Sequence, residues 1–293
     1  MRTAITTTLL LAATVLAPAA AAGQAERFET TVEAPARGRL ELHNGDGSVT
    51  IDTWNRESVR VVARRPSGLP IEVQRKGVAV VVRAPRQMER RASVDYAVTV
   101  PRSMDLEIHG MNSPVTIEGT EGRVDVHTIK GNIAVRGGRE QVGLHTVNGS
   151  VSVVGARASV EVNVVNQAVS LGDVIGTSVG INAVNGAVRL DGVDARRVEV
   201  TTVNGKIAFD GSIHPDGVYD LNAHNGGIDM TIPSDASARI QVSTHNGTLH
   251  VGFPVTIEEG PIGKRFDFTL GAGRARIELT SFNGTIELRR PGS

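Results

Sequence analysis

The chain has 293 residues, with 31 basic and 31 acidic side chains and a formal net charge of zero. This balance gives no support to a nucleic-acid-binding surface or a polybasic membrane patch. There is no cysteine, so disulfides contribute nothing to stability, and aromatic residues make up only 3% of the chain. Plentiful Val, Ile, Gly, Thr and Asn favour strands and turns over helices.

Residues 1–22 have the layout of a secretory signal peptide. One basic residue precedes an apolar stretch from Ala4 to Leu16, and the small residues Ala20–Ala22 give an A-x-A site with cleavage expected before Gly23. The apolar stretch is shorter than the roughly 20 residues of a membrane-spanning helix. We therefore expect an exported protein, periplasmic or extracellular, with no membrane span after signal removal.

Residues 27–105 contain several strand-like runs, at 58–65, 71–85 and 94–101. Within this region "LELHNGDGSVTID" is an isolated copy of the unit that recurs further along the chain, with Val49 and Ile51 after its turn. The region is predicted to be an N-terminal β module that starts the repetitive part and caps its first coil.

One unit recurs along residues 106–290. We number each unit from the Asn of its Asn-Gly pair, or from the residue that replaces that Asn, as position zero. Between Asn112 and Asn246 successive positions zero are separated by 18, 18, 18, 19, 19, 21 and 21 residues, and periods near 20 are typical of solenoids. The last step, of 37 residues to Asn283, predicts one degenerate unit in between. Position zero is occupied by Asp46, Asn112, Lys130, Asn148, Asn166, Asn185, Asn204, Asn225, Asn246 and Asn283.

Apolar and polar side chains alternate on both sides of position zero. Positions −6 and −4 are apolar nearly throughout, as at Val160 and Val162, and position −2 is mostly small. Positions +3 and +5 are again apolar, as at Ile207 and Phe209. A period of two indicates a strand with one buried face, so each unit is predicted to contribute two short strands.

Two architectures share this pattern. Asn-Gly is a strong hairpin signal, so the units could form an antiparallel meander; alternatively, each unit is one coil of a solenoid stacked on the previous coil. Several turns lack Asn-Gly, and a meander of about twenty strands would exceed common sheet sizes. The favoured prediction is an all-β fold: a single-stranded β-helix, or β-solenoid, of about nine to ten short coils with an N-terminal β capping module and one continuous core.

The Asn residues at position zero are predicted to form a structural ladder at the corner of the solenoid, with their amides satisfying backbone groups. Glycine at +1 is expected because both turn residues can require a positive φ. The predicted ladder comprises Asn112, Asn148, Asn166, Asn185, Asn204, Asn225, Asn246 and Asn283.

Three successive units carry histidine at position −3, namely His109, His127 and His145. In a stacked solenoid these rings would lie about 4.8 Å apart on the outer surface. Imidazole is a common metal ligand, so this row is a weak candidate for a shallow metal or anion site. The simpler interpretation is an exposed row in which any polar residue would serve. The sequence reveals no candidate catalytic partner for the other histidines, His43, His214, His224 and His245.

No catalytic residue and no cofactor-binding residue is predicted. The run "GTSVG" at 176–180 matches the elbow of serine hydrolases, but it lacks the required strand-to-helix context and is interpreted as a chance match. Pairs of acidic residues for glycoside cleavage need a cleft, and any solenoid face supplies such pairs. Trp54, Tyr96 and Tyr219 are too scattered to form a sugar-binding platform.

The run "TLGAGRARIELTSFNGTIELRR" resembles the C-terminal signature of the bacterial DUF4097 family, whose members are often labelled adhesins. "VDYAVTVPRSMDLEIHG" and the units "VDVHTIKGNIAVRGG" and "LHTVNGSVSVVG" are similar to the family as well. The likeness spans roughly residues 27–290. It implies an exported or membrane-attached β-solenoid, with no established set of catalytic residues.

Together these observations predict a non-enzymatic cell-envelope protein whose long β surface binds a partner or acts as a scaffold. The expected partner is an envelope protein or a polysaccharide, and self-association through exposed end coils is a further possibility. The alternative hypothesis is a carbohydrate-active enzyme, a polysaccharide lyase or hydrolase, on a β-helix. An enzyme should have a concave groove with clustered acids and aromatics, whereas a scaffold should be evenly polar.

Overall fold

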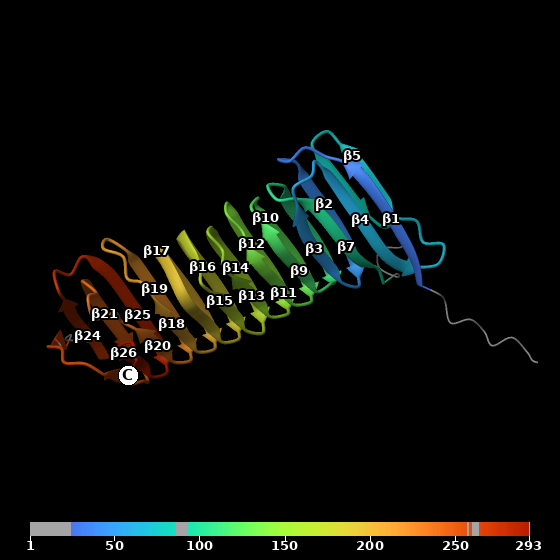
Figure 1. The fold of residues 1–293 in the computed structure, drawn as a ribbon. Helices are drawn as coiled ribbons and strands as arrows, with labels where there is room; N and C mark the ends of the chain where they lie inside the picture. The colour runs from blue at the N-terminus through green and yellow to red at the C-terminus, as the bar shows by residue number, and fades with distance from the viewer. Residues whose placement is uncertain (1–24, 86–92, 257, 260–263, 293) are drawn as a thin grey trace, which may run out of the picture.

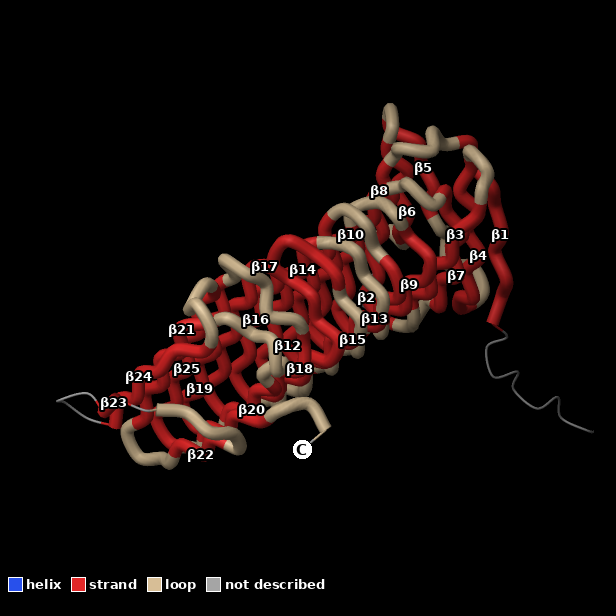
Figure 2. The backbone as a smooth tube through the Cα atoms, turned by 60° about the vertical axis from the view of Figure 1, so that its left-hand side comes forward, coloured by secondary structure: helices blue, strands red, loops and turns tan. Residues whose placement is uncertain are grey.

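The structure, a computed structural model, describes residues 25–85, 93–256, 258–259 and 264–292. These residues form two long sheets that face each other, and no helix occurs among them (Figures 1 and 2). The described segments accordingly hold no helix able to cross a membrane. The predicted signal peptide, residues 1–22, lies outside the described residues.

The first sheet, sheet A, starts at the N-terminal end of the molecule. Its spatial order is β1 (Ala25–Glu33), β4 (Ser58–Pro66), β7 (Asp95–Pro101), β3 (Val49–Trp54), β9 (Val115–Thr120), β11 (Ile133–Gly137), β13 (Val151–Val154), β15 (Val169–Gly172), the first part of β17 (Val188–Asn204), β18 (Ile207–Gly211), β20 (Ile228–Thr231), β26 (Ile286–Arg289) and β22 (Leu249–Val251).

The second sheet, sheet B, runs beside it. Its order is β5 (Glu72–Lys76), β6 (Ala79–Arg83), β2 (Arg39–Asp46), β8 (Asp105–Asn112), β10 (Val124–Lys130), β12 (Gln141–Asn148), β14 (Ser159–Asn166), β16 (Ile175–Asn185), the last part of β17, β19 (Val218–Asn225), β25 (Ala275–Asn283), β21 (Ala238–Thr244), β24 (Lys264–Leu270) and β23 (Glu258–Glu259).

Each repeat unit is one coil, with a strand in sheet B, a corner at position zero and a strand in sheet A. Strand β12 pairs in parallel with β10 and β14 in the neighbouring coils, while β13, across the corner, pairs with β11 and β15. The register is that of the sequence repeat, so Asn148 lies beside Asn166 and Val142 beside Val160. The β-solenoid prediction is confirmed, and the hairpin alternative is wrong for these units.

The core lies between the two sheets and runs along the whole stack. Side chains at −6, −4, +3 and +5 point into it; Val162, for example, is fully buried, whereas Glu161 beside it is exposed. A single cluster of buried apolar residues extends from Ala34 to Leu288. The expected junction of an N-terminal module (27–105) with the repeats (106–290) falls at the start of β8, inside this shared core.

The spatial order of the coils departs from the chain order at both ends. The coil β2/β3 lies between β6/β7 and β8/β9, and the last coil in the sequence, β25/β26, lies between β19/β20 and β21/β22. The expectation that each coil stacks on the preceding one is therefore wrong at the ends. The degenerate unit expected before Asn283 is also wrong, because β24 instead runs antiparallel to β21 on its outer side.

Antiparallel strands finish both ends of the stack. At the N-terminal end β4 and β1 extend sheet A and β5 extends sheet B, so these strands cap the solenoid as predicted (Figure 1). At the other end β24 and β23 extend sheet B, and the short strand β22 is the edge of sheet A. Self-association through the ends stays a prediction and would involve these edge strands.

Glycine at +1 is explained by close approach of neighbouring coils. A Cβ on Gly205 would overlap the carbonyl oxygen of Gly186 in the next coil, and the same holds for Gly226 against Gly205. Neither Gly205 nor Gly226 has a positive φ, and no described Asn has one. The expected φ requirement is thus wrong for the turns at Gly205 and Gly226, whereas Gly47 and Gly131, also at +1, do have a positive φ. Gln167, the non-glycine residue at +1 in its coil, is accommodated with a φ of 108°.

Val162→Asp and Glu161→Lys test the inside and outside assignment. A buried, unpaired carboxylate at Val162 should lower the free energy of unfolding by about 3–5 kcal/mol, whereas the exposed change should stay within about 0.5 kcal/mol. Urea unfolding followed by circular dichroism measures both. Equal losses in the two variants would contradict the burial pattern.

Gly205→Ala tests the close approach at the corner, with Gly180→Ala as its matched control. The first variant should lose about 1–3 kcal/mol because its methyl group has no space. A Cβ on Gly180 has no heavy atom within 4 Å, so the second should gain about 0.4–1 kcal/mol by restricting the unfolded chain. Thermal unfolding of both variants decides, and an unaffected Gly205→Ala would refute the explanation.

Candidate functional site

The outer surface of sheet B, here called face B, carries three parallel rows of side chains. Positions −6, −4 and −2 are buried, so positions −5, −3 and −1 project outward from every coil. In-register pairing places equivalent residues of neighbouring coils side by side. Face B therefore presents each row as a continuous stripe along the solenoid.

The stripe at position −1 is apolar in successive coils. We call it the apolar row; its members are between 36% and 48% exposed, although all are large hydrophobic residues. The apolar row consists of Met111, Ile129, Val147, Val165, Val184 and Val203. Beyond Val203 the same position carries stacked rings, with Phe282 lying 4.9 Å from His224 and 4.7 Å from His245 between ring centroids.

A groove runs between the apolar row and the row at position −3. It has a volume of about 640 Å³. Aliphatic side chains from Ile129 to Val203 line one side, and the −3 residues from His109 to Thr201 line the other. The groove crosses several coils, so its long axis follows the solenoid axis and not any single strand.

The row at position −3 starts with four stacked imidazoles, His43, His109, His127 and His145. Their ring centroids are 4.9, 5.6 and 4.4 Å apart in that order. The predicted spacing of the three later histidines is thus close to that observed. His43, which the predicted row omits, belongs to it, because it pairs with His109 and counting back from Asp46 places it at −3.

Asparagine continues the row beyond the histidines. The Asn163 amide lies 3.2 Å from Nδ1 of His145, and Asn182 donates to the Asn163 side-chain oxygen at 3.1 Å. Burial of the ring and then the charge of neighbouring His127 lower the pKa of His145. The neutral imidazole is therefore favoured at this position.

The row at position −5 is acidic and lies next to the histidines. Each of the first three acids meets the −3 histidine of its own strand: Glu41 and His43 are 2.8 Å apart, Glu107 and His109 3.1 Å, and Asp125 and His127 2.9 Å. The hydrogen bond to His43 lowers the pKa of Glu41. Glu41 and Glu107 thereby each gain a hydrogen-bond partner on their own strand.

Further along the acidic row the partners change. Arg197 pairs with Glu199 at 2.8 Å, and Arg276 pairs with Glu278 at 2.7 Å. Asp220 has a raised pKa, first because of burial and then because Glu278 is near. Glycine interrupts the row at Gly143 and Gly180, and each interruption leaves a position without a side chain among acidic neighbours.

The Asn residues at position zero form a chain of side-chain amides. Each Nδ2 donates to the Oδ1 of the next Asn at 2.8–3.1 Å, in the spatial order Asn246, Asn283, Asn225, Asn204, Asn185, Asn166 and Asn148. Asn112 lies in the same row between Asp46 and Lys130, without a side-chain hydrogen bond in the described structure. The amides bond one another and not the backbone, because backbone groups at the corner already bond from coil to coil, as in Gly205 N–H to Asn225 C=O.

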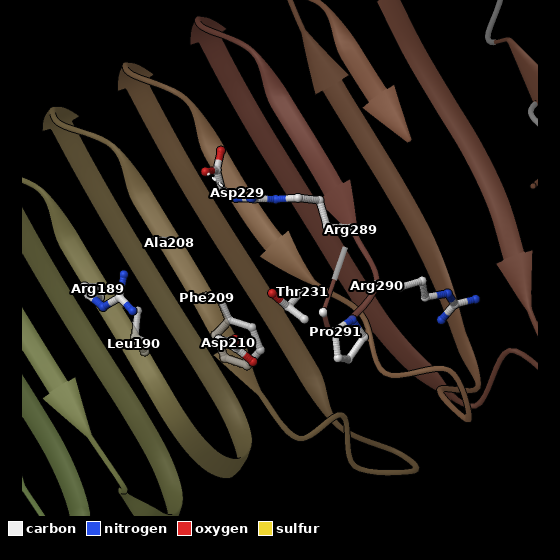
Figure 3. A pocket seen from close by; sticks show the side chains of 11 residues that line it. Arg189, Leu190, Ala208, Phe209, Asp210, Asp229, Thr231, Arg289, Arg290 and Pro291 are labelled. Atoms are coloured by element: carbon white, nitrogen blue, oxygen red, sulfur yellow. Dashed lines mark hydrogen bonds and ion pairs between the residues drawn. The ribbon is translucent and has the colours of Figure 1, made fainter. Parts of the chain in front are cut away.

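A smaller hollow of about 220 Å³ lies on the outer surface of sheet A (Figure 3). There Asp229 pairs with Lys206 at 2.5 Å and with Arg289 at 2.8 Å. Arg290 points away from Asp229 (Figure 3). Its guanidinium lies over the ring of Phe253, 4.1 Å from the ring centroid. These contacts join the C-terminal segment to sheet A, and we assign the hollow a structural role.

The other candidates from the sequence have no catalytic arrangement. Ser178 of the "GTSVG" run lies in β16, in the middle of the parallel sheet. It lines a shallow hollow of about 320 Å³ together with Glu161 and Glu199, and no aromatic side chain is among the described residues of that lining. His214 contacts Asp194 and donates its backbone N–H to the hydroxyl of Tyr219, which fixes a loop.

The apolar row is the feature that sequence reasoning missed. Its residues stand beside the turn, where alternation was interpreted only as the inside and outside of the strands. The available signal was an aliphatic residue at −1 in six successive units, at a position that projects outward. An evenly polar scaffold surface, as expected, is therefore wrong for face B.

The fold and the site together define a class: flattened parallel β-solenoids that present rows of equivalent side chains on their outer faces. The Toastrack DUF4097 family model matches residues 39–289, and the chain belongs to this family. The resemblance noted in the sequence is thereby confirmed. No curated protein matches the chain.

Several solved structures are similar to this chain. One is a "putative adhesin" from Parabacteroides merdae, with 9% identity over 91% of this chain and 97% of that one and a TM-score of 0.47. Another "putative adhesin", from Bacteroides fragilis, has 13% identity over 90% and 97% of the two chains and a TM-score of 0.40. A "putative lipid binding protein" from Parabacteroides distasonis has 8% identity over 91% and 98% and a TM-score of 0.36.

Asn185→Ala tests the amide chain, with Asn112→Ala as control. Asn185 donates to Asn166 and accepts from Asn204, so its loss should cost about 1–3 kcal/mol, given about 0.5–1.5 kcal/mol per hydrogen bond. Asn112 is also exposed but makes no such bond among the described residues, so its replacement should change stability by less than about 0.5 kcal/mol. Equal effects in chemical denaturation would show that the amide bonds contribute nothing.

Proposed function

We propose that this chain is a non-enzymatic binding protein of the cell envelope and that face B binds a segment of a partner protein. The apolar row is the observation that carries the proposal. Each of these side chains keeps 36–48% of its surface exposed to water, yet the row stays apolar in every coil from Met111 to Val203. A continuous exposed apolar stripe with a polar border is typical of an interaction surface.

The spacing of the apolar row favours a helical partner segment. Neighbouring coils are about 4.8 Å apart, so the row presents an aliphatic group at each such step over about 24 Å. One face of an extended peptide offers side chains only every 6.6–6.8 Å or so, whereas successive turns of an α-helix are about 5.4 Å apart. A helix of about 16 residues would span the row and place an apolar side chain near each coil.

Charge on face B completes the description of the partner. The acidic row at −5 runs parallel to the groove and includes Glu107, Glu161 and Glu199. A helix lying in the groove would carry Lys or Arg along its edge nearest this row, because opposite charges guide encounter and fix register. The proposed partner is therefore an envelope protein with a basic amphipathic helix.

The lining of the groove also bears on the other partner class, polysaccharides. Sugar-binding surfaces rely on exposed aromatic rings that stack on the sugar. The described residues that line this groove are aliphatic, amide, hydroxyl and imidazole side chains, with no Trp, Tyr or Phe. This composition favours a protein partner over a glycan and gives the carbohydrate-active enzyme no support.

A paired set of variants tests the groove. Val147→Asp combined with Val165→Asp places charges in the apolar row, whereas Ser152→Asp combined with Ser170→Asp makes the matched change in the same two coils on the outer surface of sheet A. Each mature protein is immobilised, and captured envelope proteins are quantified. Central contacts of an interface are worth about 2 kcal/mol or more each, so the groove variant should lose its partner by about thirtyfold or more while the control does not.

A photo-crosslinking amino acid at Val165, with one at Ser170 as control, identifies the contact directly. The crosslinked peptide should come from an amphipathic helix with basic residues. Capture that is unchanged by Val147→Asp and Val165→Asp, in proteins that unfold like the wild type, would refute the proposal. Reproducible cleavage in a screen of cell-wall polysaccharides would refute the non-enzymatic part.

A further inference from the structure

We infer that Asp125, His127 and His145 form a binding site for a divalent transition metal, of which zinc is the best fit. The inference stands apart from the proposed partner function, because it rests on ligand chemistry and not on the apolar row. Asp125 and His127 lie on β10 and His145 lies opposite on β12. One ligand atom from each residue lies within 4.8 Å of the other two.

A missing side chain creates the space for the ion. Gly143 is the neighbour of Asp125 in the −5 row, so no side chain stands beside Asp125 on β12. A Cβ built on Gly143 would lie 3.6 Å from Oδ1 of Asp125 and 3.9 Å from Nε2 of His145. Both potential ligand atoms therefore face the position that Gly143 leaves open.

The ligand set fits zinc. Zinc takes imidazole nitrogen and carboxylate oxygen at about 2.0–2.2 Å in tetrahedral geometry, and three protein ligands leave one position for water or a partner. Tetrahedral ligand atoms lie about 3.3 Å apart at such bond lengths, and Nε2 of His127 is already 2.9 Å from Oδ1 of Asp125. The His127 side chain is 46% exposed and that of His145 is partly exposed. Both rings can therefore rotate slightly, which brings Nε2 of His145 to the distance that zinc needs.

The surroundings supply the electrostatics of a cation site. Glu161 is the next −5 residue beyond Gly143, so a carboxylate stands on each side of the open position, Asp125 on one strand and Glu161 on the other. Asn163 Nδ2 lies 3.2 Å from Nδ1 of His145, so Nε2 is the nitrogen that faces the open position.

The same arrangement does not occur one or two coils earlier. His43 and His109 are also stacked, at 4.9 Å between ring centroids, and each meets a glutamate of its own strand. There, however, both −5 positions are filled, by Glu41 and Glu107, and no open position lies between them. His43 is thus a matched control in the same row.

Zinc titration of the metal-free mature protein, produced without a polyhistidine tag, tests the site. Isothermal titration calorimetry should show one zinc ion per chain for the wild type and for His43→Ala. Loss of outer-shell partners alone weakens metal sites by about 10–100-fold, so His145→Ala and Asp125→Ala should weaken zinc binding by about a hundredfold or more.

Gly143→Val tests the open position without changing any of the three proposed ligands. A valine suits an exposed strand position, and the built Cβ meets only ordinary contacts, so the variant should unfold like the wild type yet lose zinc. In long-range imidazole NMR spectra, zinc should shift His127 and His145 and leave His43 unchanged. No binding by the wild type, equal binding by His145→Ala, or equal binding by Gly143→Val would overturn the inference, while leaving the helix-binding proposal untouched.

Discussion

In-register parallel pairing between neighbouring coils is the constraint on which the rest of the structure depends. A slip of one residue would exchange the buried and exposed faces of a strand, so the register is fixed by the core positions −6, −4, +3 and +5. Once it is fixed, every outward position becomes a row whose members are about 4.8 Å apart. Equivalent residues then interact whether or not their interaction is favourable.

The consequences differ from row to row because the side chains differ. A side-chain amide both donates and accepts, so each asparagine at position zero can donate to one neighbouring asparagine and accept from the other, as from Asn246 to Asn148. A carboxylate only accepts, so the acids at −5 cannot bond one another and instead contact a histidine, an arginine or an asparagine, as Glu41, Glu199 and Asp220 do. Apolar residues at −1 neither attract nor repel their neighbours strongly, so the register alone does not account for an apolar side chain at this position in six successive coils.

Much of the fold was predictable from the sequence alone, because residues that are one repeat apart are the residues that pair in the structure. The steps of 18–21 residues predicted which strands pair, and the alternation around Val162 and Ile207 predicted the core. The corner was predicted less well. The overlap that a Cβ on Gly205 would have with Gly186 is a contact between coils, and propensity arguments consider only the φ of one residue. His127 and His145 were candidate ligands from the sequence alone, but the part that Gly143 plays in the proposed metal site was not predictable, because it depends on which side chains of neighbouring coils lie beside it.

The ends could not be predicted from the repeat, because there the chain order and the spatial order differ. A stack that simply adds coils in chain order ends in an open strand on which another chain can pair. Here the last coil, β25/β26, lies inside β21/β22, and β24 then covers β21 in the antiparallel direction. The N-terminal end has the same arrangement, because the coil β2/β3 lies between β6/β7 and the rest of the stack. At each end, a coil from elsewhere in the chain order is therefore inserted between the outermost coil and the rest of the stack. The outermost coil pairs with this inserted coil on its inner side. On its outer side, in sheet B, it pairs with an antiparallel strand, β24 at one end and β5 at the other.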